Sequence, residues 1–493
     1  MLAWGSMSQK NNVASQVNNS KLVQNHYHFV YFVSLALASI FFIKNELALL
    51  ALLILYVIAI FRQKEPVFLA ISAYYLSFIW LWDSSSDWIL TGIDSGYIKA
   101  FLLVSIGSIY LKDVKNFNLY IIALSLALLA ILCLSFLRSS NMGVAVKYFL
   151  NLYIPFVLML LILSSRRVYY PRCGRAVNAF IYSVVLFSFC SSIIVVLTNY
   201  SLLEFLSLGI SDNRTDSELK EVLVNGDLIM LGGGLVTSLF GYEFVRNPGA
   251  FVDPILAGYI LAFSFIYIMF FQKKSKYFFL TLCGVSLLLT FSKGAWLIAF
   301  FAIVSTYANM LIWGKGLFAK IFFNVVLFST FLSTLLFQAV DGVGSSAFLH
   351  FLGLSQTFIE FPSLLGNDLG SGGNYANLDF FEKLKRGAES TIGVVFYHIG
   401  YLGLAVFLLA YFFCVGILLS KKEKEYAVLV SLMISQLAVS FLQENTFNLG
   451  YLLPRLFIFY GIFYAIQSKK IRPENLEAGA TPSDGWGKYG ALP

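Results

Sequence analysis

Charged residues are scarce in this sequence. Asp, Glu, Lys and Arg make up 12% of its 493 residues, whereas 59% are hydrophobic and 17% are aromatic. A soluble globular domain carries about 25% charged residues, so the composition excludes a water-soluble fold. The apolar runs are about 15–22 residues long, which is the length of membrane helices and not of barrel strands. We therefore predict an all-α polytopic membrane protein.

Cysteine patterns and nucleotide-binding motifs are also missing. The five cysteines are scattered, mostly inside apolar runs. No two of them have the spacing of metal ligands, so we predict neither a disulfide framework nor a metal site. The chain contains no P-loop, no Gly-x-Gly-x-x-Gly motif and no sequence repeat, and we expect no cofactor. The segments "LGGGL" and "GSGGN" are read as flexible hinges.

Fourteen apolar segments are candidate membrane spans. They are 27–43, 47–61, 67–82, 97–111, 119–137, 148–165, 177–198, 251–271, 277–291, 294–313, 317–339, 391–418, 426–441 and 449–466. With the N-terminus in the cytoplasm, every cytoplasmic loop is basic, and 22 of the 34 Lys and Arg residues fall on that side. This agreement with the positive-inside rule predicts an even number of spans and two cytoplasmic termini. It also accounts for the net charge of +8 without nucleic acid binding.

The spans divide the chain into tails, helical blocks and two long outer loops. The segments are a cytoplasmic tail (1–26), spans 1–7 (27–198), an outer loop (199–250), spans 8–11 (251–339), a large outer loop (340–390), spans 12–14 (391–466) and a disordered cytoplasmic tail (467–493). Each outer loop has about 50 residues, and long structured loops usually carry function. A short helix is predicted at 216–224, and the second loop is glycine-rich and then amphipathic.

Three cations lie at the predicted outer edge of the membrane, against the positive-inside bias. Arg246 precedes the eighth span, Arg386 precedes the twelfth, and Lys293 lies in the turn between the ninth and tenth. Cations in such places need a counter-ion or an anionic ligand, and none is obvious in the sequence. We expect them to surround one phosphate group of a lipid, which arginine binds bidentately. The alternative for Lys293 is that its side chain extends along apolar surface and places the ammonium group at the membrane–water interface, without binding a ligand.

Three segments carry a family resemblance. "VRNPGAFVDPILAGYILAF" resembles the R-x-x-G-x-F-x-[DN]-P segment of bacterial O-antigen polymerases and ligases. "LTFSKGAWL" resembles their T-x-S-R-G segment, and "LGNDLGSGG…GAESTIGVVFYHIGYLG" resembles the segment in which a large outer loop enters a late span. The order of these segments also matches, over about residues 150–465. Two positions depart from the family: Lys293 replaces its arginine, and Glu389 stands where the ligases have a histidine.

The resemblance implies a Wzy-type polymerase with a GT-C-like fold in the bacterial inner membrane. Such enzymes are metal-independent glycosyltransferases that join oligosaccharide units carried on undecaprenyl diphosphate at the periplasmic face. A single displacement would invert the anomeric centre. The implied partners are the lipid-linked oligosaccharide, the bilayer, and a chain-length regulator and flippase of the same pathway. The product is O-antigen, capsule or exopolysaccharide.

The implied chemistry assigns roles to individual residues. Arg246, Lys293 and Arg386 would stabilise the departing diphosphate, and Glu389 would deprotonate the attacking sugar hydroxyl. The remaining candidates are Asp253, Glu243 and His398 as other bases or substrate-binding groups, and Asn374, Tyr375 and Asn377 as the lining of a glycan cleft.

Alternative readings stay open for the site and for the function. Glu389 could be only the N-cap of the helix that follows it, and His398 could be an interior residue that holds helices together. For the whole protein, the alternatives are an O-antigen ligase, a flippase for lipid-linked oligosaccharides and a non-enzymatic scaffold. A flippase should show two related halves and charges near the bilayer midplane, whereas the cations here are predicted at one surface.

Overall fold

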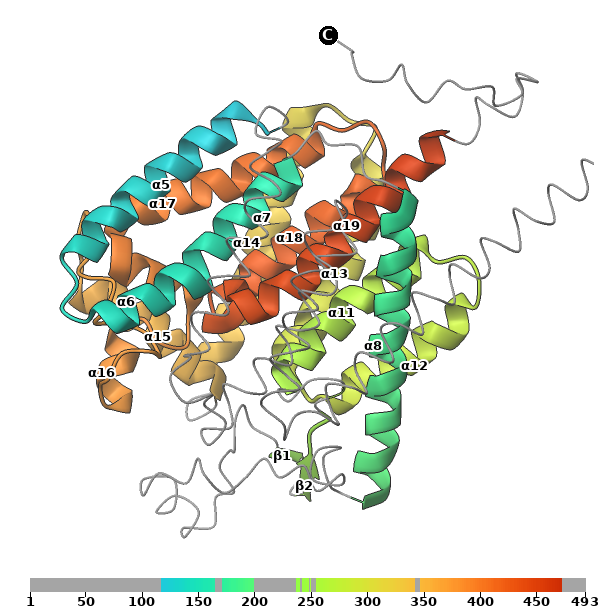
Figure 1. Ribbon diagram of the computed structural model, residues 1–493, viewed down its shortest axis with the longest axis horizontal. Coiled ribbons are helices and arrows are strands. Elements are labelled where there is room, and N and C mark those ends of the chain that lie inside the picture. The colour runs from blue at the N-terminus through green and yellow to red at the C-terminus, as the bar shows by residue number, and fades with distance from the viewer. Residues whose placement is uncertain are drawn as a thin grey trace, which may run out of the picture.

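A computed structural model describes residues 117–164, 171–198, 236–239, 242–247, 249, 254–341 and 346–471 (Figure 1). Several predictions lie outside these residues. They are the spans 27–43, 47–61, 67–82 and 97–111, the tail 1–26, most of the tail 467–493, the helix at 216–224, and Asp253.

The described chain is built almost entirely from helices. The helices are α5 (Leu119–Leu137), α6 (Met142–Tyr148), the π-helix η2 (Phe149–Tyr153), α7 (Ile154–Ser164), α8 (Pro171–Thr198), α11 (Pro254–Phe271), α12 (Lys276–Leu289), α13 (Lys293–Ile312), α14 (Leu317–Asp341), α15 (Ser346–Glu360), α16 (Phe380–Lys385), α17 (Thr391–Leu419), α18 (Tyr426–Ser440), the 3-10 turn η4 (Glu444–Phe447) and α19 (Leu449–Ile471). Two short strands, β1 (Val236–Leu239) and β2 (Tyr242–Val245), pair antiparallel. The sequence did not predict this hairpin.

Eight helices of the described part are long and apolar enough to cross a membrane, and α12 and α18 are shorter apolar helices. Each predicted span from 119–137 onward coincides with one of these helices. The chain is therefore a multi-pass helical membrane protein, as the composition predicts. The sixth span begins earlier than predicted, at Met142, because Asn141 caps α6 by accepting a hydrogen bond from the Val144 amide.

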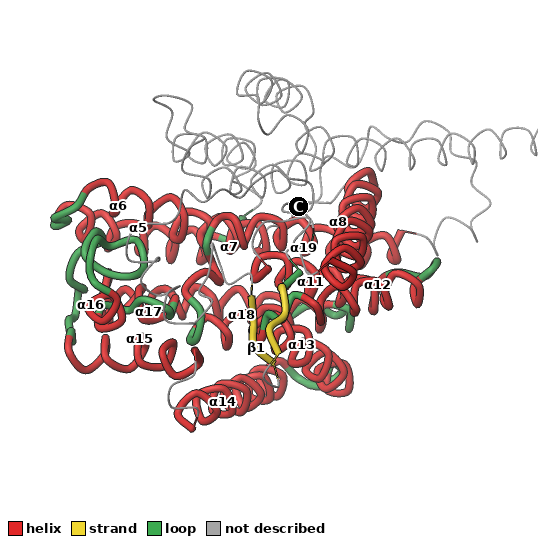
Figure 2. Tube along the Cα trace, turned by 90° about the horizontal axis from the view of Figure 1, so that it is seen from below, coloured by secondary structure: helices red, strands yellow, loops and turns green. Residues whose placement is uncertain are grey.

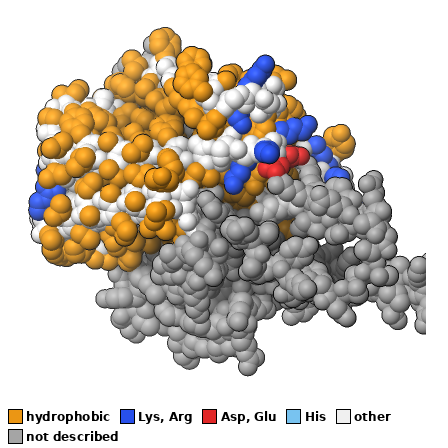
Figure 3. All heavy atoms as spheres, turned by 90° about the horizontal axis from the view of Figure 1, so that it is seen from above, with side chains coloured by type: hydrophobic (Ala, Val, Ile, Leu, Met, Phe, Trp, Pro, Cys, Tyr) orange, Lys and Arg blue, Asp and Glu red, His pale blue; other side chains and the backbone are white. Residues whose placement is uncertain are grey.

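The helices of the described chain gather into one bundle (Figure 2), and its centre is made of buried apolar side chains. The central helices are α11, α18 and α19, and 89% of the apolar window of α19 is buried, against 22% for α14. α14 instead exposes large apolar side chains such as Phe318 and Phe322. Figure 3 shows a broad apolar face with Lys and Arg side chains gathered at its edges. An outer ring of apolar side chains is what contact with lipid requires.

Segments predicted on the outer side meet at one end of the bundle. The turn after α5 contacts the second loop, because Arg138 Nη2 donates to the Leu365 carbonyl over 2.9 Å. The same loop contacts the turn between α18 and α19, where Asn448 Nδ2 donates to the Tyr375 hydroxyl over 2.7 Å. At a junction predicted to be cytoplasmic, Lys320 Nζ donates to the Leu419 carbonyl. Each of these contacts joins chain segments that the predicted topology places on the same side of the membrane.

The second loop contains structure that the sequence did not predict. α15 occupies the first half of this loop, between α14 and the glycine-rich segment. The loop also inserts against a kink in α17, where Gly400 has φ 66° and ψ −167°. Tyr401 N there donates to the Ser363 carbonyl over 3.0 Å. A β carbon on Gly400 would lie 2.3 Å from Gly366 N, so the loop and α17 can meet only at a glycine.

Candidate functional site

Glu389 lies between α16 and α17, and its backbone is left-handed with φ 69°. It does not cap α17. The N-cap is Ser390, which has the extended conformation of a cap (φ −135°, ψ 122°) and accepts a hydrogen bond from Gly393 N over 3.0 Å. A helix has one N-cap residue, so the reading of Glu389 as this cap is wrong. The carboxylate is left for another role.

The Glu389 carboxylate is paired with His350 of α15. His350 Nδ1 lies 3.0 Å from Glu389 Oε2 and 3.0 Å from the Glu389 carbonyl oxygen. Both oxygens are acceptors, so Nδ1 carries a proton in this arrangement. Burial raises the pKa of Glu389, but the hydrogen bond and the charge of His350 outweigh it, and the pKa lies below its ordinary value. The carboxylate is ionised at neutral pH, and 30% of its side chain is exposed.

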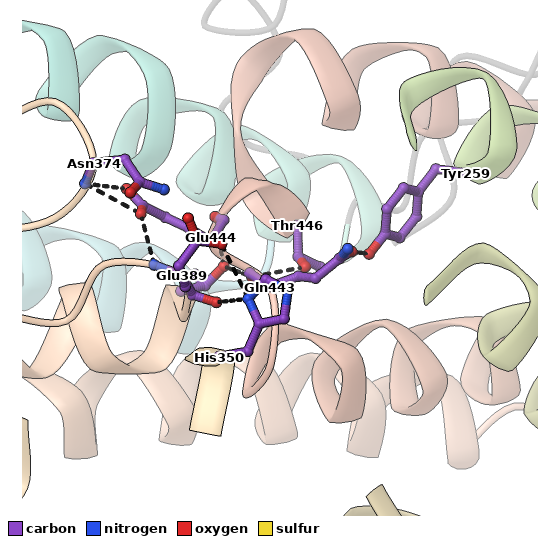
Figure 4. A network of polar contacts seen from close by, with 8 residues as sticks. Tyr259, His350, Asn374, Glu389, Gln443, Glu444 and Thr446 are labelled. Carbon is purple, nitrogen blue, oxygen red and sulfur yellow. Dashed lines mark hydrogen bonds and ion pairs between the residues drawn. The ribbon is translucent and has the colours of Figure 1, made fainter. Parts of the chain in front are cut away.

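A second acid, Glu444 of η4, lies directly beside Glu389 and is buried. Its Oε2 accepts a hydrogen bond from Glu389 N over 3.2 Å, and its Oε1 accepts one from the Tyr148 hydroxyl over 2.8 Å. Asn374 N donates to both oxygens (Figure 4). Burial raises the pKa of Glu444 to about 7, and the charge of Glu389 adds to this shift while the hydrogen bonds oppose it.

The glycan-cleft candidates lie on the loop that faces these two acids. Asn374, Tyr375 and Asn377 are exposed. Tyr375 N donates to the Tyr148 hydroxyl over 3.1 Å, and its ring packs 4.9 Å from the Tyr148 ring. The structure therefore brings Asn374 and Tyr375 to the site of Glu389. Asn377 lies on the same loop, two residues after Tyr375.

His398 lies inside α17 and is fully buried. Its Nδ1 is 3.1 Å from the Tyr153 hydroxyl, and its ring packs edge-on against Tyr148 at 4.5 Å. Its contacts join α17 to α6 and η2, which is the interior packing role that the sequence left open. Tyr148 connects His398 to the acid pair, because its ring packs on the His398 ring and its hydroxyl donates to Glu444.

Lys293 and Arg246 lie together at the start of α13. Arg246 Nε donates to the Thr290 carbonyl over 2.8 Å, three residues before Lys293. Lys293 is exposed and is the first residue of α13. Among the described residues, no acidic side chain forms an ion pair with it.

The start of α13 also lacks a side-chain cap. Ser292 occupies the N-cap position, but its side chain makes no capping hydrogen bond. Its Oγ is buried and has no hydrogen-bond partner within the described chain. The first N–H groups of a helix attract anions when no side chain caps them. Exposed Lys293 adds a full positive charge to that partial one.

Gln443 lies between the basic helix start and the acid pair, and Figure 4 shows it beside Glu444 with its side chain reaching toward Tyr259. It directly precedes Glu444, and its carbonyl accepts hydrogen bonds from the backbone and side chain of Thr391, the first residue of α17. Its side chain binds the Tyr259 hydroxyl of α11. A β carbon added to Gly294 would lie 2.8 Å from Gln443 Oε1, so the residue after Lys293 touches Gln443. The helix starts of α13 and α17 are therefore neighbours.

Arg386 differs from the other two predicted cations. It ends α16, and its Nη2 lies 3.7 Å from Glu382 Oε2, while its Nη1 donates to the Ser371 carbonyl. Its guanidinium also lies over the Phe361 ring at 5.7 Å. The expectation that Arg386 has no counter-ion is therefore wrong, because an i,i+4 pair supplies one within α16. These contacts belong to the second loop, not to the start of α13.

The remaining acid candidates are only partly placed. Glu243 lies in β2 opposite Ser238, and the residues described place its backbone but not its side chain. Asp253 lies outside the described residues. In the described part of the chain, no group of three or more His, Cys, Asp or Glu side chains is arranged to hold a metal ion.

Sequence reasoning missed His350 and Glu444. His350 is 39 residues from Glu389 in the chain, on a helix that hydropathy did not indicate. Glu444 had a usable signal, because it is the only acid between Glu425 and Glu474 and lies in a short turn between two apolar spans. An acid at the membrane edge is a candidate functional residue by the same reasoning that selected the cations.

The arrangement provides the groups for proton transfer and for anion binding. Glu389 is ionised, partly exposed and within reach of solvent-borne hydroxyl groups, so it can accept a proton. The open N-terminus of α13, with Lys293 and Arg246, can hold an anion.

No known family model matches the chain, and neither a curated protein nor a solved structure matches it.

Proposed function

We propose that this protein is a Wzy-type polysaccharide polymerase of the bacterial inner membrane. It joins oligosaccharide units carried on undecaprenyl diphosphate at the periplasmic face, without a metal or cofactor. The proposal includes fourteen spans, two cytoplasmic termini and a GT-C-like arrangement. Its support is the resemblance of three segments to that family, together with the position of their residues. Lys293 and Glu389 come from different segments, and their helix starts meet at Gln443.

The neighbouring helix starts of α13 and α17 are the observation that carries the proposal. One offers an open N-terminus with an exposed cation, and the other offers an ionised carboxylate paired with His350. Glycosyl transfer from a lipid diphosphate needs these two things: a place for the departing diphosphate and a proton acceptor for the attacking hydroxyl.

In the proposed reaction, the diphosphate lies at the start of α13. Lys293, the Arg246 guanidinium and the helix N–H groups bind its oxygens. The hydroxyl of the incoming lipid-linked unit attacks the anomeric carbon of the growing chain. A new C–O bond forms as the bond from the anomeric carbon to the phosphate oxygen breaks. The proton passes to the Glu389 carboxylate, and undecaprenyl diphosphate leaves with its negative charge bound by the cations.

The other residues have supporting roles in this proposal. His350 holds the Glu389 carboxylate in place and keeps it ionised. Asn374 and Tyr375 lie where the acceptor sugar would pass, and aromatic rings offer a flat apolar face to a sugar. Arg386, paired with Glu382, shapes the loop that carries them. A chain-length regulator and a flippase of the same pathway are proposed partners.

Deletion of the gene tests the proposal against its alternatives. A strain without the polymerase should display single repeat units on its acceptor, and wild-type protein should restore the ladder of longer chains. Long chains stored on the carrier lipid would indicate a ligase, and absence of any exported unit would indicate a flippase. An unchanged polysaccharide would contradict all three.

A further inference from the structure

Glu444 is a buried acid that has no role in the proposed reaction. Only 8% of its surface is exposed. No Lys, Arg or His side chain of the described chain forms an ion pair with it. A buried carboxyl group is costly unless hydrogen bonds satisfy it. The groups that donate to Glu444 therefore show what the residue does.

The three donors come from segments that are far apart in the chain, and all three converge on the Glu444 carboxyl group. Tyr148 belongs to α6, Asn374 to the glycine-rich part of the second loop, and Glu389 to the residue pair before α17. Two of the three donors are backbone N–H groups of the loop that forms the candidate site. Glu444 thus fixes the path of that loop's backbone, not only the direction of one side chain.

The backbone of Glu389 needs such a fixed partner. Its φ of 69° is unusual for a residue with a side chain, and within the described part only Ser275 and Phe291 share it among non-glycine residues. A left-handed residue persists when its surroundings hold it there. Glu444 binds the N–H of Glu389 and His350 binds its carbonyl oxygen, so both backbone polar groups of the strained residue are held.

The turn that bears Glu444 also holds the first residue of α17. Thr391 Oγ1 donates to the carbonyl oxygens of Gln443 and Glu444 over 2.6 and 2.7 Å. Thr391 N donates to the Gln443 carbonyl over 3.2 Å. The turn η4 is thus attached on both sides of Ser390, the N-cap of α17.

In the second loop, Gly373 allows the loop backbone to come close to Tyr148. It has φ 74°, and a β carbon at this position would lie 2.0 Å from the Tyr148 hydroxyl oxygen. Any side chain would push the loop off Tyr148 and carry Asn374 N away from the Glu444 carboxyl group. The glycine therefore lets the loop reach the acid.

We propose that Glu444 is a positioning residue that fastens the second loop to the membrane helices and holds Glu389 in its reactive place. It accepts from the Asn374 and Glu389 amides, so the proton acceptor and the loop beside it move as one unit with η4 and α6. That Glu444 fastens the loop stands on the contacts alone. Its effect on turnover rests on the proposed function.

The substitution Glu444→Gln separates this role from simple space filling. Glutamine keeps the size of the side chain, but one of its two polar ends is an NH₂ group that cannot accept a hydrogen bond. Asn374 N donates to both oxygens, so it loses one of its two acceptors in either orientation of the amide. Glu389 N loses its acceptor when the NH₂ group takes the place of Oε2. Glu360→Gln is the matched control, because Glu360 is an exposed acid at the end of α15 whose carboxylate lies 4.0 Å from Lys385 Nζ.

The test is hydrogen exchange on the full-length protein in lipid nanodiscs, followed by mass spectrometry of peptides covering 371–377 and 386–391. In Glu444→Gln, exchange at one or both of Asn374 and Glu389 should be at least about 10-fold faster, because a buried hydrogen bond that protected the amide is lost or weakened. In Glu360→Gln, exchange at both residues should stay within about 2-fold of wild type.

Turnover provides the second readout. In a reconstituted polymerisation assay, Glu444→Gln should lower kcat about 10–100-fold and leave KM within about 3-fold, because a misplaced proton acceptor slows the chemical step. Unchanged exchange at Asn374 and Glu389 would overturn the positioning role, whatever the activity. Faster exchange in a protein whose wild type makes no polymer would support the fastening and contradict the proposed function.

Gly373→Ala keeps the test decisive if Glu444→Gln does not insert into the membrane. The alanine leaves the Glu444 carboxylate intact and displaces only the loop. Exchange should rise about 10-fold at Asn374 and stay within about 2-fold at Glu389, because the Glu389 N–H keeps its acceptor. Unchanged exchange at Asn374 would contradict the proposal.

Discussion

The starts of α13 and α17 are alike in backbone and opposite in charge. Each helix follows a left-handed residue that is not glycine, Phe291 with φ 48° and Glu389 with φ 69°. Each has a serine at its N-cap position. Ser390 caps α17 with a 3.0 Å hydrogen bond, whereas the buried Ser292 hydroxyl has no partner in the described chain.

The two helix starts differ in the charge of the group that each can bind. A cation in the first turn of a helix is unfavourable by about 0.3–1 kcal/mol, yet Lys293 begins α13. An anionic ligand would reverse that penalty. At α17 the Ser390 hydroxyl accepts from the Gly393 N–H, and the Gln443 carbonyl accepts from the Thr391 N–H. The negative charge of Glu389 is therefore not used to cap this helix. The comparison predicts an anion at one helix start and a proton donor at the other.

Glu389→Gln should break the α17 side of the comparison and have the largest effect. Glutamine keeps the size of the side chain but cannot accept the proton, and loss of a general base costs about 10²–10⁴-fold in rate. The variant should insert normally, bind the lipid-linked unit and make almost no polymer, as measured by the polysaccharide ladder. Near-normal chain length would move the proton acceptor to Asp253, Glu243 or His398.

Arg246→Ala should weaken the binding of the diphosphate at the start of α13. Removing one fixed donor from a charge-stabilising site costs about 10²–10³-fold in rate. Polymerisation should fall accordingly while the amount of protein in the membrane is unchanged. Arg246→Lys is the matched control and should retain intermediate activity, since it keeps the charge and loses the bidentate fork. Equal activity of the alanine variant and wild type would show that Arg246 only holds the turn at Thr290.

His350→Gln should test the role of Glu389 at the start of α17 through the pH dependence of kcat. His350 lowers the pKa of Glu389 against the opposing effect of burial. Without the imidazole, burial remains and the pKa rises. A carboxyl group with a lowered pKa in the folded chain contributes stability that is present above its unfolded pKa and lost as pH falls. The acid limb of the kcat profile should therefore move to higher pH, and an unmoved limb would separate His350 from the ionisation of Glu389.

The two serines provide a direct contrast with smaller effects. Ser390→Ala removes a helix cap and should lower the free energy of unfolding by about 1 kcal/mol. Ser292→Ala removes a buried hydroxyl that has no partner among the described residues, so stability should be unchanged or slightly higher. Thermal unfolding of both variants in detergent measures this. A larger loss of stability for Ser292→Ala than for Ser390→Ala would reverse the comparison.

Lys293→Arg should have the smallest effect. Both side chains are cations, and arginine restores the residue of the resembling family. Polymer length and rate should stay within about 3-fold of wild type, because binding of phosphate by a point charge or by a fork serves the same purpose here. Loss of activity in this variant would indicate that the site requires the compact ammonium group.

Hydropathy predicted most of the described fold. Every predicted span from 119–137 onward is a helix, because a membrane helix must satisfy its own backbone and therefore shows a long apolar run. The hairpin of β1 and β2 and the helix α15 were missed. Their residues lie in loops, where the local sequence mixes apolar and polar residues and long-range packing decides the conformation.

The site was predictable only in its separate parts. Arg246, Lys293 and Glu389 were selected because a charge at the membrane edge is costly unless it has a partner or a ligand. The sequence could not place them relative to one another, since the link runs through Gln443 and the start of α17. His350 and Glu444 reach Glu389 by tertiary packing alone, and the counter-ion of Arg386 depends on α16 forming.

A structure of the protein with a bound undecaprenyl-diphosphate-linked unit tests the central claim most directly. The account predicts diphosphate oxygens within hydrogen-bonding distance, about 2.7–2.9 Å, of Lys293 or Arg246 at the start of α13. It also predicts an acceptor hydroxyl about 2.6–3.2 Å from the Glu389 carboxylate. A diphosphate bound at the opposite end of the bundle, near Lys320, or held only by Arg386 would contradict it.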